Sequence, residues 1–163
     1  MIINEAIDFP MDFTPPAIVQ TISSQSAAYQ KEEMRKLETV VACLILEAGG
    51  EGKVGMEAVN EVIHERAKKQ NKSLYEIVTA PKQFSVFKNG ITTAVERAKK
   101  HSKWVEATRI LKDPLTNHTR GADHYHTPSV RPSWSKELLK RLYKTIRIGS
   151  HIFYYPTKVK PSF

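Results

Sequence analysis

The pattern of apolar positions along this 163-residue chain changes near Lys31. The first 30 residues contain Pro10, Pro15 and Pro16 and a polar stretch, and we interpret them as an N-terminal extension. From Lys31 onward, apolar residues recur every three or four positions, as on one stripe of an amphipathic helix. They are Met34, Leu37, Val41, Leu44 and Ala48. Gly49-Gly50 should end this helix, because glycine adopts the left-handed conformation found at helix C-termini.

Further helices are predicted after the glycine pair. A helix over residues 54–70 would bury four apolar side chains and stop at Asn71; the four are Ala58, Val59, Val62 and Ile63. Ser73 and Glu76 form a capping-box pattern that should open a short helix ending near Ala80. Two more helices are expected to start at Thr93, with Glu96 as its capping partner, and at Ser102. They should run toward His101 and Leu111.

The C-terminal part of the chain mixes loop, helix and strand signals. Residues 113–134 are polar and rich in His and Thr, with one short strand expected over 122–126. A helix capped by Ser133 or Ser135 should reach about Lys144. Gly149-Ser150 suits a two-residue hairpin turn that pairs residues 146–148 with 151–153. The predicted fold class is therefore α+β, with five or six helices and a small antiparallel sheet in one domain over residues 31–163.

Composition narrows the class of protein. With 40% apolar and 26% charged residues, the chain is typical of a globular protein, and no apolar run is long enough to span a bilayer. No secretory signal peptide is expected at the N-terminus. Cys43 is the one cysteine, which excludes an internal disulfide and favours a plain buried thiol. The net charge of +8 would attract polyanions such as nucleic acid, anionic membranes or cell-wall polymers, although solvated helix faces are the simpler explanation of the scattered basic pairs.

Two glutamates in the stretch LILEAGGEG are candidates for chemistry. On a helical wheel, Glu47 lies at the edge of the apolar stripe, in the last turn of its helix. Partial burial and the negative end of the helix dipole both disfavour its charged form, so its pKa should be raised, as a general acid requires. Glu51 follows the helix break, where it should be exposed and ionised. The glycines between them would let a substrate approach closely.

The same stretch opens a series of motifs that resembles the SleB-like cell wall hydrolases, the family of spore cortex-lytic enzymes and their phage relatives. The matching residues are Glu47-Ala48-Gly49-Gly50-Glu51, Gly55, Ala58-Val59, Val62 and Arg66, then Gln83-Phe84-Ser85, Gly121-Ala122 with Tyr125, Pro132 with Trp134, and Ile148-Gly149, His151 and Phe153-Tyr154. The resemblance covers about residues 36–155. One departure is His64-Glu65-Arg66, where the family usually has Asn-Arg.

The resemblance implies a lysozyme-like fold and a lytic transglycosylase that cuts the β-1,4 bond between N-acetylmuramic acid and N-acetylglucosamine. Glu47 would be the acid/base residue that forms the 1,6-anhydro product. Residues expected to contact the glycan strand are Glu51, Gln83, Phe84, Ser85, His124, Tyr125 and His126. We expect a monomer without a cofactor or a nucleic-acid partner. Without a signal peptide or a separate wall-binding domain, it looks more like a phage lysin, made in the host cytoplasm to act on the envelope, or a virion-associated one.

Other functions remain open at this point. Glu47 and Glu51 could act together as the two carboxylates of a hydrolytic lysozyme. In a strand over 122–126, His124 and His126 would share a face and could bind zinc with His118 or His151, as in a cell-wall amidase. The sequence has no HExxH motif to support zinc. A basic nucleic-acid-binding module is disfavoured because no aromatic RNA-binding motif or zinc finger is present.

Overall fold

The computed structural model describes residues 17–157, and the chain divides into two compact units, Met1–Arg35 and Lys36–Phe163. In the first unit, the described residues form the N-terminal part of helix α1 (Ala17–Ala48). The predicted helix start at Lys31 is therefore wrong: the helix is already present at Ala17. Residues 23–35 are exposed, including Met34, which the apolar stripe had placed toward the core. Because this segment has no buried face, apolar periodicity could not reveal it.

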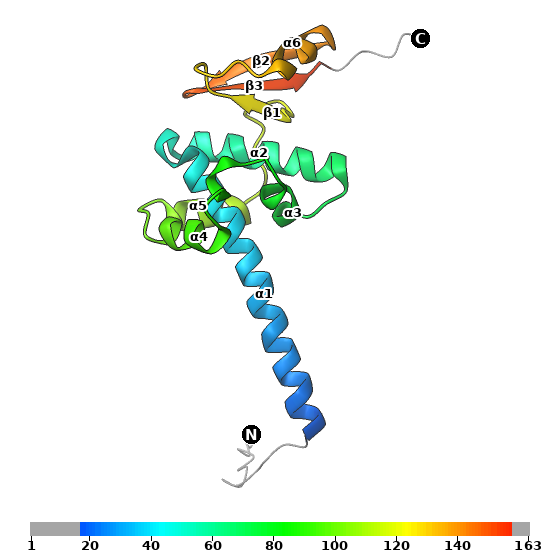
Figure 1. Ribbon diagram of the computed structural model, residues 1–163, viewed down its shortest axis with the longest axis vertical. Helices are drawn as coiled ribbons and strands as arrows, with labels where there is room; N and C mark the ends of the chain where they lie inside the picture. Colours follow the sequence, from blue (N-terminus) through cyan, green and yellow to red (C-terminus); the bar gives the residue numbers. More distant parts are fainter. Residues whose placement is uncertain (1–16, 158–163) are drawn as a thin grey trace, which may run out of the picture. The chain divides into compact units, whose positions relative to one another are not determined.

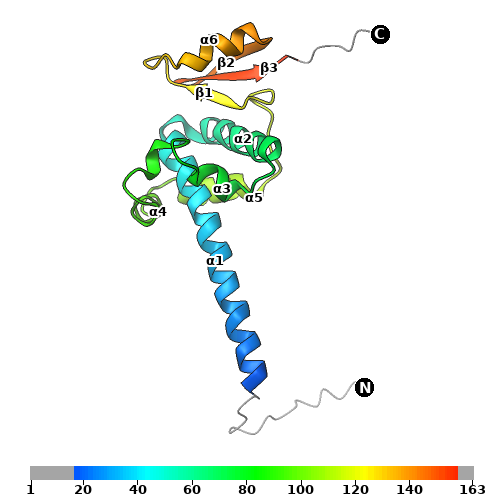
Figure 2. The same ribbon diagram turned by 45° about the vertical axis from the view of Figure 1, so that its right-hand side comes forward.

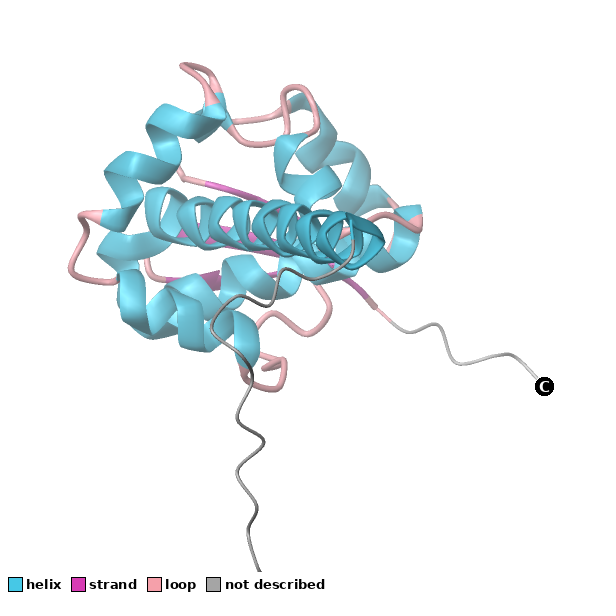
Figure 3. Cartoon of the chain, turned by 90° about the horizontal axis from the view of Figure 1, so that it is seen from below, coloured by secondary structure: helices cyan, strands magenta, loops and turns pink. Residues whose placement is uncertain are grey.

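The second unit holds the remaining elements. After α1 come η1 (Gly49–Glu51), α2 (Gly52–Gln70), α3 (Leu74–Thr79), η2 (Ser85–Phe87), α4 (Ile91–Lys99), α5 (Trp104–Lys112), β1 (His124–His126), α6 (Ser133–Lys140), β2 (Tyr143–Ile148) and β3 (His151–Pro156). Helices dominate and the three strands form one small sheet, which confirms the predicted α+β class (Figure 3). In two views, α2 lies between the sheet and the helices α3, α4 and α5 (Figures 1 and 2).

Local sequence signals explain several element boundaries. α1 ends at the glycines as predicted, and the residue with a positive φ is Gly52, with φ of 73°, after the single turn of η1. α2 stops at Asn71, which is left-handed with φ of 51°. The Ser73–Glu76 capping box is present in full, with both reciprocal hydrogen bonds.

Three helix boundaries differ from the predictions. α4 begins at Ile91 after Gly90, and α5 begins at Trp104 after Lys103, and neither helix has a side-chain cap. The helix that opens at Ser133 ends at Lys140, four residues early, because Leu142 turns into the left-handed region and β2 follows at once. Capping patterns missed the starts of α4 and α5, since water or 3₁₀-type bonds can satisfy the backbone groups of a helix end that has no side-chain cap.

The sheet has the order β1-β3-β2 and is antiparallel throughout. The predicted hairpin is confirmed and longer than expected, with Ile148 opposite His151 and Ile146 opposite Phe153. On the other side of β3, Tyr125 of β1 stands opposite Phe153. Phe153 is fully buried, so the central strand ties the sheet to the helical core.

The core surrounds the C-terminal end of α1. Six consecutive residues, Val40 to Ile45, are buried, so this part of the helix is enclosed on all sides rather than on one stripe. α2 contributes the predicted Ala58, Val59, Val62 and Ile63, each 0% exposed. In the described residues, no helix combines the length and apolar character needed to cross a membrane.

A buried carboxylate fixes the long loop that leads to β1. Glu61 of α2 accepts hydrogen bonds from the hydroxyl groups of Thr116 and Thr119 and from the backbone N–H groups of His118 and Thr119, at 2.6–2.7 Å. Glu61 is only 5% exposed, so these four donors replace the water that its charge loses on burial. The loop is thereby held on α2 and delivers β1 beside it.

Candidate active site

Glu47 lies in the last turn of α1 and is half-buried, as the helical wheel predicted. Its Oε2 accepts a hydrogen bond of 2.8 Å from the hydroxyl of Tyr125 on β1. Burial raises the pKa of Glu47, while the hydrogen bond from Tyr125 and the positive charge of Arg66 oppose part of that rise. The net direction is upward, so the neutral acid persists to a higher pH than in an exposed glutamate.

Arg66 of α2 supplies the positive charge near Glu47. Its Nε donates to the backbone carbonyl of Asp123 at 2.7 Å, and its Nη1 donates to Oε1 of Gln83 at 3.3 Å. The guanidinium carbon also stands 5.5 Å from the centre of the Phe84 ring. These contacts fix the cation between α2, the loop after α3 and the start of β1.

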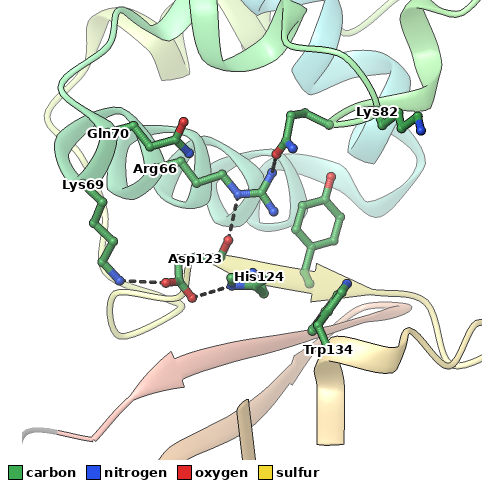
Figure 4. Close-up of a pocket in the computed structure, with 9 residues that line it drawn as sticks. Arg66, Lys69, Gln70, Lys82, Asp123, His124 and Trp134 are labelled. Atoms are coloured by element: carbon green, nitrogen blue, oxygen red, sulfur yellow. Dashed lines mark hydrogen bonds and ion pairs between the residues drawn. The ribbon is translucent and has the colours of Figure 1, made fainter. Parts of the chain in front are cut away.

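A pocket of about 550 Å³ opens beside these residues. Figure 4 shows Arg66, Lys69 and Gln70 of α2 on one side, with Asp123, His124 and Trp134 facing them. Lys82, Gln83 and Tyr125 complete the lining. Glu47 is joined to this pocket through Tyr125, whose ring lines it and whose hydroxyl binds the carboxyl group.

Asp123 forms the charged floor of the pocket. Its carboxylate accepts hydrogen bonds from Lys69 at 2.7 Å, His124 Nδ1 at 2.8 Å and the Tyr143 hydroxyl at 2.9 Å. Burial alone would raise the pKa of Asp123, but the hydrogen bonds from His124 and Lys69 outweigh it and hold that pKa well below its usual range. Asp123 therefore remains ionised and positions its partners.

Aromatic rings gather on the face of β1 that carries His124 and His126. Trp134, at the start of α6, stands 4.9 Å from the ring of His124, 5.7 Å from that of His126 and 5.3 Å from that of Tyr154. The prediction that the two histidines share a face of the strand is thus confirmed. Tyr125 points the opposite way, stacked on Phe153 at 5.3 Å and edge-on to His151 at 5.1 Å.

Glu51 has a different environment from Glu47. Its two carboxylate oxygens accept hydrogen bonds from the backbone N–H of Ser150, at 3.0 Å, and from the Ser150 hydroxyl. These bonds lower the pKa of Glu51, in the direction expected for an ionised carboxylate. They also attach that carboxylate to the hairpin turn. A Cβ atom on Gly149 would stand 1.8 Å from Glu51 Oε2, and one on Gly55 would stand 2.2 Å from Glu51 Cβ. Both glycines of the motifs therefore make room for this glutamate.

The three residues of the Gln83-Phe84-Ser85 motif do not act together. Gln83 reaches the pocket and binds Arg66. Phe84 is buried, with 6% exposure, and its ring packs against the guanidinium of Arg66. Ser85 lines a separate hollow of about 230 Å³ near Gly90 and Arg97. Of the three, Gln83 is the one whose placement suits contact with a ligand in the main pocket.

The histidines of the zinc alternative have protein partners. His126 Nδ1 donates to the Thr127 carbonyl at 2.7 Å, and its Nε2 meets the Tyr154 hydroxyl at 2.9 Å. The other suggested ligands lie elsewhere: His118 binds Glu57, and His151 packs on Tyr125. Across residues 17–157, no three His, Cys, Asp or Glu side chains are placed to share a metal ion.

Sequence reasoning did not select several residues that line or support the pocket: Arg66, Lys69, Asp123, Trp134 and Tyr143. Arg66 and Trp134 stood in the motifs but were not chosen as site residues. The sequence signal that could have selected Arg66 is its position one helical turn after Val62, at the edge of the buried face of α2. Asp123 lies 54 residues after Lys69 and 20 residues before Tyr143, so no local sequence pattern joins the three.

The mainly helical domain thus presents a half-buried glutamate with a raised pKa beside an open polar pocket, an arrangement suited to acid–base chemistry. The comparison with known families is specific: the family described as Cell Wall Hydrolase matches residues 50–154, and the chain belongs to that family. No curated protein and no solved structure matches the chain. The protein is therefore an enzyme that acts on peptidoglycan. The match begins at Gly50, so the choice of Glu47 rests on its geometry and on the resemblance noted above.

Proposed function

We propose that the protein is a lytic transglycosylase that cuts the bond between N-acetylmuramic acid and N-acetylglucosamine, with Glu47 as its acid/base residue. The observation that carries the proposal is the state of Glu47: a half-buried carboxyl with a raised pKa, held by Tyr125 at the edge of the pocket. A protonated acid near neutral pH is what cleavage of a glycosidic bond requires first.

The proton movements follow from the hydrogen bond to Tyr125. Because Oε2 accepts from the Tyr125 hydroxyl, Oε1 is the oxygen free to carry the acidic proton. Glu47 gives this proton to the glycosidic oxygen as the bond to the muramoyl C1 breaks. The resulting carboxylate then takes the proton of the muramoyl C6 hydroxyl as O6 bonds to C1. The 1,6-anhydro ring closes, and Glu47 regains the proton it started with.

The environment of Glu51 favours this one-carboxylate reaction over two-carboxylate hydrolysis. A hydrolytic lysozyme needs a second carboxylate free to activate water or attack the sugar. Both oxygens of Glu51 are engaged by Ser150 in the hairpin turn. The other nearby acid, Asp123, is held by Lys69, His124 and Tyr143. Arg66 and Tyr125 can stabilise the Glu47 carboxylate while it waits for the second proton transfer.

The main pocket suits a sugar chain. Trp134 offers an apolar ring, held by His124 and Tyr154, on which a sugar face can stack. Around it, Gln83, Lys69 and Lys82 supply hydrogen-bond donors for hydroxyl and N-acetyl groups. We therefore place the glycan strand along this pocket, with the scissile bond near Glu47.

Digestion of purified peptidoglycan, with the soluble products read by mass spectrometry, tests the proposal. Anhydro-muropeptides are the expected products. Reducing-end muramic acid would instead mean hydrolysis, and free peptide stems would mean an amidase; either result overturns the proposed reaction. An amidase that uses zinc through His124 and His126 would in addition lose activity in a chelator and regain it with zinc.

A Glu47→Gln variant tests the site assignment. We expect a loss of about 10²–10⁴-fold in the rate of anhydro-product formation, because the amide cannot donate or accept the proton. Glu96→Gln is the matched control, since Glu96 is an exposed glutamate on α4. The control should keep full activity. Full activity in Glu47→Gln would remove Glu47 from the mechanism.

A further inference from the structure

A second pocket, of about 650 Å³, lies next to the proposed glycan site and has no role in the reaction described above. Its lining consists of Glu65, Lys68, Asn117, Arg120, Gly121, Lys144, Tyr155, Pro156 and Thr157. Three cations thus face one carboxylate, so the pocket has a net positive charge. A concave site with excess positive charge attracts anionic groups more strongly than a flat surface does.

The cations of this pocket are available to a ligand. Within the part of the chain that the structure describes, no ion pair joins Lys68 or Lys144 to a carboxylate. Glu65, the one acid, stands 3.8 Å from Lys69 of the neighbouring pocket, so its charge is partly offset there. Two lysine ammonium groups are therefore left with solvent as their partner.

Arg120 is held in place for binding. Its backbone is left-handed, with φ of 58°, which is unusual for a residue other than glycine and often marks a functional position. Its guanidinium carbon lies 5.7 Å from the centre of the Tyr155 ring, and Nη1 donates to the Tyr155 hydroxyl at 3.3 Å. The remaining N–H donors of the guanidinium stay free to bind a carboxylate in the bidentate manner.

The pocket also borders the glycan site directly. Glu65 and Lys68 line it, while the next residues of α2, Arg66 and Lys69, line the first pocket. Oε1 of Glu65 in the second pocket stands 3.8 Å from Nζ of Lys69 in the first, whereas an extended tetrapeptide spans about 13 Å. A peptide attached to a sugar in the first pocket can therefore reach the second.

We propose that this second pocket binds the peptide stem of peptidoglycan through its free carboxylate groups. The inference rests on the proposed function, because it takes the ligand to be another part of the same polymer. The ring of Tyr155 and the side chain of Pro156 add apolar surface for the methyl and methylene groups of such a peptide. That surface favours a peptide carboxylate over a bare phosphate, since phosphate offers nothing apolar to cover it.

Binding to the uncleaving Glu47→Gln protein tests this pocket by isothermal titration calorimetry at low salt. The probes are a disaccharide-tetrapeptide, the same disaccharide without its peptide, and the free tetrapeptide. We expect the stem to tighten binding about tenfold. Adding Arg120→Gln and Lys144→Gln should abolish that gain and leave binding of the stem-free disaccharide as it was. The matched control adds Lys100→Gln and Lys112→Gln, which remove two exposed charges at the C-terminal ends of α4 and α5 and should keep the gain.

Several results would overturn the proposal. Equal affinity with and without the stem would do so, and so would an equal effect of the two double substitutions. Competition by poly(glycerol phosphate) that is stronger than by the tetrapeptide would assign the pocket to phosphate polymers. Circular dichroism melting checks that each variant is folded. If the wild-type protein yields no anhydro-products but still binds the free tetrapeptide through Arg120 and Lys144, the proposed function fails and the pocket assignment stands.

Discussion

Glu47 experiences opposed influences that set its protonation state. Burial favours the neutral acid, while the Tyr125 hydroxyl and the charge of Arg66 favour the carboxylate. The helical position of Glu47 was enough to predict its half-buried state and the direction of its pKa shift. Its partners could not be predicted, because Tyr125 lies 78 residues away and reaches Glu47 only through the packing of β1 beside α2.

Removing the Tyr125 hydroxyl should change the pH dependence of cleavage. That hydroxyl lowers the pKa of Glu47, so in Tyr125→Phe the pKa rises further and the acid keeps its proton to a higher pH. The fall of kcat/KM on the alkaline side should therefore move upward. The ring is retained, so its stacking on Phe153 persists.

The measurement for Tyr125→Phe is a pH–rate profile on a soluble glycan fragment. Tyr143→Phe serves as the control, because its hydroxyl binds Asp123 and makes no contact with Glu47 in the described structure. The control should leave the alkaline limb where it is. A limb that stays in place in Tyr125→Phe, or moves to lower pH, would contradict the role given to this hydrogen bond.

Trp134 should contribute to binding more than to chemistry. Its replacement by Leu removes the stacking surface, so we expect KM to rise severalfold with a smaller change in kcat. The other tryptophan, Trp104, packs against the helical core and provides the matched control Trp104→Leu. That control also leaves Trp134 as the one fluorescent tryptophan, and its emission should change when a glycan fragment is added. Unchanged emission at saturating glycan would place the sugar elsewhere.

At the scale of elements, the hairpin turn and the start of α2 depend on each other through Glu51. The hairpin itself was predictable, because Gly149-Ser150 is a strong local signal between two β-prone runs. The attachment of the turn to Glu51, 99 residues earlier, was not, and neither was the reason for Gly55. The family motifs thus contain glycines whose role is steric clearance for a carboxylate that anchors the sheet.

Gly149→Ala should destabilise the protein by about 1–3 kcal/mol. The new Cβ would stand 1.8 Å from Glu51 Oε2 and force that carboxylate away from Ser150, and φ of 57° adds backbone strain. Chemical denaturation measures the loss. Gly50→Ala is the control, because a Cβ there meets nothing within 4 Å, and it should change stability little.

A double-mutant cycle separates the two causes in Gly149→Ala. In a Glu51→Ala background the steric conflict is gone and only the backbone strain remains, so Gly149→Ala should cost less than it does in the wild-type protein. Equal costs in the two backgrounds would show that Glu51 does not set the requirement for glycine at this turn.

At the scale of the whole molecule, charge and composition predicted the broad class and little else. The α+β class followed from the alternation of helical stripes with a hairpin signal, whereas the lysozyme-like arrangement stays a prediction. The net charge of +8 fits an anionic envelope as target, and part of that charge lines the two pockets beside α2. The helical residues 23–30 of α1 escaped prediction because exposed residues carry no hydrophobic period.

The catalytic domain predicted over residues 31–163 should fold and act without the N-terminal extension. Residues 23–35 are exposed and the buried core begins near Thr39, so the described residues just before the domain add little buried surface to it. We expect the melting temperature of the shortened protein to stay within about 2 °C of the full chain, since 1 kcal/mol corresponds to roughly 2–4 °C at this size. Its rate on soluble glycan fragments should match that of the full chain.

A drop in melting temperature of more than about 5 °C, or a loss of activity on these fragments, would make the extension part of the catalytic unit. A loss of activity confined to intact cell walls would instead give the extension a role in reaching the polymer.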